Sequence, residues 1–112
     1  VAGLAIQANG TIVVAAIYQQ WGTPTYGTYT LAPSDHQRDI VLLKLGPSGT
    51  WLAAERIGNV SNGWSATEDA IDIEVLPNGR TVLLANFTST NLAVGASTVS
   101  TRGGNDILLT TR

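Results

Sequence analysis

The chain has 112 residues, of which 44% are hydrophobic and only 12% are charged, and its formal net charge is −2. A chain this short forms at most one small domain, and its large apolar share excludes a disordered protein. The six basic residues form no run, which excludes nucleic-acid binding, and no apolar stretch is long enough for a membrane helix. The chain has no cysteine, which excludes disulfides and thiolate metal sites.

Seven β-strands and no long helical period are expected along the chain. The expected strands span residues 2–8, 11–18, 39–45, 51–57, 70–76, 80–87 and 106–112. Asn9-Gly10 separates the first two strands, and Asn78-Gly79 separates the fifth from the sixth. Asn-Gly between two apolar runs is a strong hairpin signal and predicts a type I′ turn at both places.

The strands fall into two copies of one unit. Asn78-Gly79 lies 69 positions after Asn9-Gly10, and Asp106-Ile107 lies 67 positions after Asp39-Ile40. Self-similarity of this kind indicates a repeat architecture. We therefore divide the chain into a first blade repeat, residues 1–58, and a second, incomplete one, residues 59–112. The second copy has no counterpart of the fourth strand, so we expect either that this strand is supplied from elsewhere or that the chain is a piece of something longer.

Apolar residues on both faces of several strands predict how the sheets pack. The runs at 11–18, 40–45 and 81–87 are apolar at consecutive positions, so both faces need cover. Trp51 and Ile57 alternate along the fourth strand and are expected to share a core between blades. Sheet packed on sheet supplies the cover, as in a β-propeller. The predicted fold is therefore all-β, with about two four-stranded antiparallel blades of a β-propeller, the last blade lacking its outer strand.

One stretch resembles a known repeat family. Residues 39–51, DIVLLKLGPSGTW, resemble the Asp-Ile-x-x-x-Lys-Leu-x-x-x-Gly-x-x-Trp pattern of the SBBP-type bacterial β-propeller repeat. Residues 69–79 are similar to its inner strand and turn, and residues 103–107 to its Gly-Gly-x-Asp-Ile junction. The resemblance covers most of the chain and implies a propeller in a secreted or cell-surface bacterial setting, with no catalytic residues. Arg38 stands where the family has Gly, and residues 19–37 match nothing in it.

Residues able to carry chemistry are few. His36 is the only histidine, and without a second histidine or a cysteine we expect neither a metal site nor general-base catalysis. Asp72 and Glu74 share one face of a strand, where contact with water explains them. Asp39 and Asp106 recur at the start of equivalent strands and are expected to accept backbone N–H groups of the preceding loops.

Three aromatic residues gather in the long loop 19–37, namely Trp21, Tyr26 and Tyr29. Aromatic side chains on a loop held by a rigid scaffold stack on sugar rings or contact a partner, and they also serve as the packing of the loop itself. Both interpretations stay open, and these three residues are the candidate ligand- or partner-binding residues.

The expected function is that of a non-enzymatic extracellular module, structural or for protein–protein interaction, within a larger propeller or assembly. Two blades leave two apolar sheet faces bare, so the expected partners are further blades of a longer chain or identical chains. The alternative is a carbohydrate-binding, lectin-like propeller that uses loop 19–37 and has a glycan as its partner. No cofactor, metal, nucleic acid or membrane insertion is expected.

Overall fold

The computed structural model describes residues 3–18, 23–32, 38–59 and 67–112, and this part of the chain forms antiparallel β-sheets without a helix. The strands are β1 (Gly3–Ile6), β2 (Ile12–Tyr18), β3 (Thr25–Tyr26), β4 (Tyr29–Thr30), β5 (Asp39–Leu45), β6 (Trp51–Asn59), β7 (Glu68–Val75), β8 (Thr81–Phe87), β9 (Leu92–Val94), β10 (Ser97–Val99) and β11 (Asp106–Thr111). The all-β prediction is confirmed, and each of the seven predicted strands is present.

The hairpin turns have a different geometry from the predicted one. Gly10 N–H donates to Gln7 O at 2.9 Å and Gln7 N–H donates to Thr11 O at 2.8 Å, which closes a three-residue loop. Gly46–Thr50 and Leu76–Arg80 repeat this pattern, and the glycines of the three loops have φ between +82° and +87°. This is a type I turn followed by a left-handed glycine. The type I′ prediction was wrong because each loop contains one residue more than that turn allows.

The first repeat supplies β1, β2, β5 and β6, which pair in that order as an antiparallel meander. The expected four-stranded sheet is nevertheless six-stranded, with the order β1-β2-β5-β6-β9-β10. The two additional strands come from the second repeat, because β9 pairs with the end of β6 through Gly58 with Ala93 and Asn59 with Leu92. The second sheet has the order β11-β8-β7, so it contains the three strands predicted for the second repeat.

Each of the two long connections contains a short hairpin that was not predicted. β3 and β4 form one between β2 and β5, and β9 and β10 form the other between β8 and β11. Gly27 and Gly95 occupy the two turns with φ of +61° and +59°. They lie 68 positions apart, between the two shifts of the strand pairs, so the repeat includes the hairpin turn within residues 19–37, a stretch that matches nothing in the SBBP-type family.

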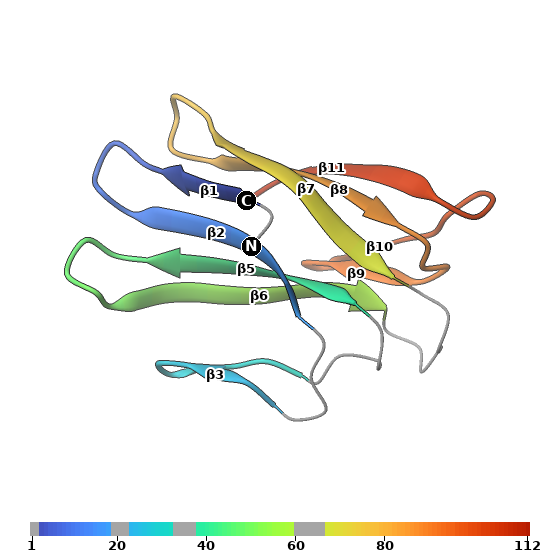
Figure 1. Ribbon diagram of the computed structural model, residues 1–112, viewed down its shortest axis with the longest axis horizontal. Helices are drawn as coiled ribbons and strands as arrows, with labels where there is room; N and C mark the ends of the chain where they lie inside the picture. The colour runs from blue at the N-terminus through green and yellow to red at the C-terminus, as the bar shows by residue number, and fades with distance from the viewer. Residues whose placement is uncertain (1–2, 19–22, 33–37, 60–66) are drawn as a thin grey trace.

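The two sheets form two layers with the main core between them, and Figure 1 shows β7 crossing over the first sheet. β7 contacts β1, β2 and β5. The approach is close at Gly3, because a Cβ there would lie 2.6 Å from Ile73 Cγ2. The buried core side chains are Val13, Ala15, Ile40, Leu42 and Ile57 from the first repeat and Ala70, Ile73, Leu83, Ala85, Phe87, Leu92, Val94 and Leu108 from the second.

Trp51 does not share a face with Ile57, contrary to expectation. The pairing of β5 with β6 shifts between Lys44 and Leu45, so that Leu45 pairs with Trp51 whereas Lys44 pairs with Ala53. This β-bulge adds one residue to β6 and reverses the alternation beyond it. Ile57 is therefore buried in the core between the sheets, whereas Trp51 packs on the opposite face of the first sheet.

Candidate interaction surfaces

Two of the predicted binding residues lie in the β3–β4 hairpin. Tyr26 and Tyr29 flank its turn, whereas Trp21 lies outside the described residues, as does His36. The Tyr26 ring packs edge-on against Trp51, with ring centroids 5.3 Å apart and an interplanar angle of 68°. The Tyr29 hydroxyl donates a hydrogen bond to Leu52 O at 2.6 Å. Both tyrosines thus hold the hairpin on β6, and the sugar-binding interpretation stays a prediction.

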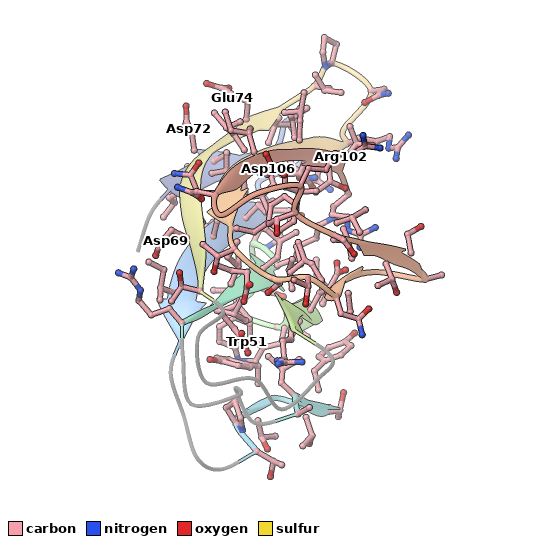
Figure 2. All side chains as sticks on the ribbon, turned by 90° about the vertical axis from the view of Figure 1, so that its right-hand side faces the viewer. Trp51, Asp69, Asp72, Glu74, Arg102 and Asp106 are labelled. Carbon is pink, nitrogen blue, oxygen red and sulfur yellow. The ribbon has the colours of Figure 1, made fainter. Side chains whose placement is uncertain are left out.

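The hairpin covers part of one face of the first sheet. Leu31, Val41 and Leu43 form a small buried cluster there, against which Tyr26 and Trp51 pack. Figure 2 shows Trp51 beside this hairpin, at the far side of the first sheet from the second one. Among the described residues, this cluster includes none from β1.

The rest of this face of the first sheet is open and apolar. Leu4 pairs with Val14 and Val14 with Leu43, so these three side chains share the face that turns away from the second sheet. Leu4 is 57% exposed and Ile6, two residues further along β1, is 63% exposed. We call this surface the first outer face.

The second sheet has a corresponding open surface on its far side. Ile107 and Leu109 on β11 are 69% and 68% exposed. Leu84 pairs with Leu109 and with Asp72, which places all three on one face, and Val82 pairs with Glu74 on that face. Figure 2 shows Asp72 and Glu74 projecting outward from β7. We call this surface, with its shallow hollow of about 70 Å³ between β7 and β8, the second outer face.

Polar contacts join the two repeats at the margins of the core. Arg38 pairs with Asp69 at 3.0 Å, and the Arg112 guanidinium pairs with Glu55. Glu68 is fully buried and accepts a hydrogen bond from the Ser89 hydroxyl within the second repeat. Sequence reasoning missed these contacts because each joins residues that are far apart in the sequence.

The two recurring aspartates behave differently. Asp106 Oδ2 accepts the Arg102 N–H at 2.8 Å, which is the predicted loop contact. Asp39 is fully buried, and its Oδ2 accepts a hydrogen bond from Arg56 Nε at 2.7 Å. Arg56 lies on the neighbouring strand β6, so this contact helps to fix β5 against β6. Residues 33–37 lie outside the described part of the chain, so the predicted contact of Asp39 with the preceding loop stays a prediction.

Within the described ranges, no group of three or more His, Cys, Asp or Glu side chains is arranged to hold a metal ion. The same part of the chain contains no helix of the length and apolar character needed to cross a bilayer. Comparison of the chain with family models, with curated proteins and with solved structures gave no match.

Proposed function

We propose that this chain is a structural and interaction module of an extracellular bacterial β-propeller, in which both outer faces pack against further repeats of the same kind. The proposal is of a non-enzymatic scaffold. It is supported by the SBBP-like motif at residues 39–51 and by the two-layer arrangement of the repeats. The partners are further blades, supplied by a longer chain or by identical chains.

One observation carries the proposal. Apolar side chains that are exposed on the two outer faces stand at repeat positions whose counterparts in the other repeat are buried between the sheets. Ile107 corresponds to Ile40. Ile107 is 69% exposed, whereas Ile40 is 0% exposed. Leu109 corresponds to Leu42, and the two are 68% and 3% exposed. The β11 part of the second outer face therefore repeats the surface by which the first sheet contacts the second, and its apolar side chains can receive a next sheet. On β7, Asp72 and Glu74 stand at the positions of Gly3 and Ala5, so this strand does not repeat the close approach seen at Gly3.

The same relation holds at the other end. Leu4 corresponds to Ile73, which is 4% exposed in the core between the sheets, whereas Leu4 is 57% exposed. The first outer face thus repeats the surface by which the second sheet contacts the first. An interface between two different surfaces, one from each neighbour, continues from copy to copy and forms a ring when the rotation closes.

The positions of the two short hairpins, β3–β4 and β9–β10, support the same succession of repeats. β9–β10 of the second repeat reaches back to pair with β6, the outermost strand of the first repeat. β3–β4 occupies the equivalent place in the first repeat, over the first outer face. If a preceding repeat packed on that face, the outermost strand of that preceding repeat would lie beside β3–β4.

The mass of the particle in solution tests this proposal. The purified 112-residue chain is expected to associate, with native mass spectrometry and light scattering giving an integer multiple of 11.7 kDa. Association follows from the exposed apolar side chains of both outer faces, which a soluble monomer avoids. A folded chain that stays monomeric across the accessible concentration range would contradict the proposal.

A further inference from the structure

A cavity of about 350 Å³ opens between strands β5 and β6 of the first sheet and the end of β11 in the second. β5 and β6 contribute Leu42, Lys44, Ala53 and Glu55 to its wall, and the second repeat contributes Arg80, Thr111 and Arg112. Its volume lies in the range of small-molecule sites, which are about 300–1,000 Å³.

The charge at this cavity is unbalanced. Three of the lining side chains are cations and one is a carboxylate, so their net charge is +2 in a chain whose net charge is −2. Glu55 is engaged by the Arg112 guanidinium, and Arg80 Nη2 donates to Thr111 Oγ1 at 2.7 Å. These contacts fix both arginines at the rim.

In the ranges that the structure describes, one buried donor at the cavity is unsatisfied, and one cation there has no partner. Arg112 Nε is buried and has no hydrogen-bond partner among the described residues. Lys44 has neither an ion pair nor a hydrogen bond from its ammonium group within the described part of the chain. Leu42 lies on the same face of β5 as Lys44, two residues away, and Ala53 pairs with Lys44, so an apolar floor lies beside the free cation.

We propose that this cavity binds a small organic carboxylate. The carboxylate group lies between Lys44 and the Arg112 guanidinium, where charge-assisted hydrogen bonds form, and the apolar body of the ligand rests on Leu42 and Ala53. The apolar floor favours an organic anion over inorganic phosphate. The cavity lies within a single chain, so this proposal is independent of how the outer faces are used.

Nuclear magnetic resonance titration of the chain with hexanoate tests the proposal. Saturable shifts are expected at the amides of Lys44, Ala53 and Thr111, whereas hexanamide, which has the same shape without the charge, is expected to cause none. Lys44→Gln is expected to weaken hexanoate binding about ten- to a hundredfold, because it removes a charged hydrogen-bond donor. Arg102→Gln, which removes an exposed cation outside the cavity, is the matched control and is expected to bind hexanoate normally.

Each other outcome overturns the assignment. Shifts that do not saturate, or that persist unchanged in Lys44→Gln, would show that the cavity does not recognise the carboxylate. Saturable binding of inorganic phosphate without binding of hexanoate would contradict the organic carboxylate. Equal losses of hexanoate affinity in Lys44→Gln and Arg102→Gln would show that the effect comes from the overall charge of the chain and not from this cavity.

Discussion

Asp39 and Gly58 show how closely β5 and β6 approach at single residues. Asp39 is fully buried and bonded to Arg56 across the two strands. A Cβ at Gly58 would lie 2.5 Å from Asp39 Oδ1 and 2.6 Å from its Cγ. Any side chain at this glycine therefore displaces the carboxylate from its position beside Arg56.

Gly58→Ala is expected to lower the free energy of unfolding by about 1–3 kcal/mol, the usual cost of overpacking. Chemical denaturation followed by circular dichroism measures the change. Gly46→Ala is the control, since a Cβ there meets no atom closer than 3.4 Å, which is ordinary contact. Equal losses in the two variants would show that the Asp39 contact is not the cause.

Tyr29 and Tyr26 allow a similar comparison within the β3–β4 hairpin. Tyr29→Phe removes the hydrogen bond to Leu52 O and is expected to cost about 0.5–1 kcal/mol, the lower part of the usual range because the bond is exposed. Tyr26→Phe keeps the ring contact with Trp51 and is expected to change stability little. Thermal unfolding checks this prediction, because Tyr29→Phe is expected to unfold at a lower temperature than Tyr26→Phe. The reverse order of the two melting temperatures would contradict it.

At the scale of elements, the β9–β10 hairpin ties the second repeat to the first. Leu92 is fully buried in the core between the sheets and pairs with Asn59 at the end of β6. Leu92→Ala is expected to cost about 2–5 kcal/mol, as other large-to-small core substitutions do. Hydrogen exchange is expected to quicken in β9 and at the end of β6 and to change least in β1.

Thr98→Ala is the control for that variant, because Thr98 is exposed on β10 of the same hairpin. It is expected to leave exchange at the end of β6 unchanged. If Leu92→Ala also left it unchanged, the hairpin would not be holding the two repeats together.

Sequence reasoning predicted the long strands and missed the short ones for a physical reason. The seven long strands have apolar runs or alternation bounded by turn residues, and those signals are local. β3 and β4 have two residues each, and the Tyr26 ring and the Tyr29 hydroxyl hold them against β6. Such contacts are tertiary and leave no periodicity in the sequence.

The sequence did not predict the β-bulge in β6 either. The register shift beside Leu45 moves Trp51 to the face opposite Ile57, although the spacing of these residues predicted a common face. A bulge changes which residues pair, and pairing depends on the neighbouring strand. Of the candidate binding residues, Tyr26 and Tyr29 were correctly placed in one loop, but their partners Trp51 and Leu52 were not foreseen.

For the whole molecule, the repeat accounts for both the core and the open faces. Positions that are buried between the two sheets are exposed at each end of the pair, at Leu4 on one side and at Ile107 and Leu109 on the other. Blocking one face should therefore leave the opposite face able to associate. This property separates a head-to-tail assembly from one in which like surfaces meet.

Thr50→Lys is the control for such blocking variants, because it adds a charge at an exposed turn position outside both outer faces. It is expected to associate as the unmodified chain does. Loss of association in this variant would show that added charge alone prevents assembly.

The most direct test of head-to-tail packing mixes two chains that are each blocked on one face. Ile6→Lys places a charge on the first outer face and Leu109→Glu places one on the second, so each variant alone is expected to be a monomer by native mass spectrometry. An equimolar mixture is expected to contain a dimer with one chain of each kind, formed by the two unblocked faces. Association of either variant alone, or a mixture that stays monomeric, would contradict the account.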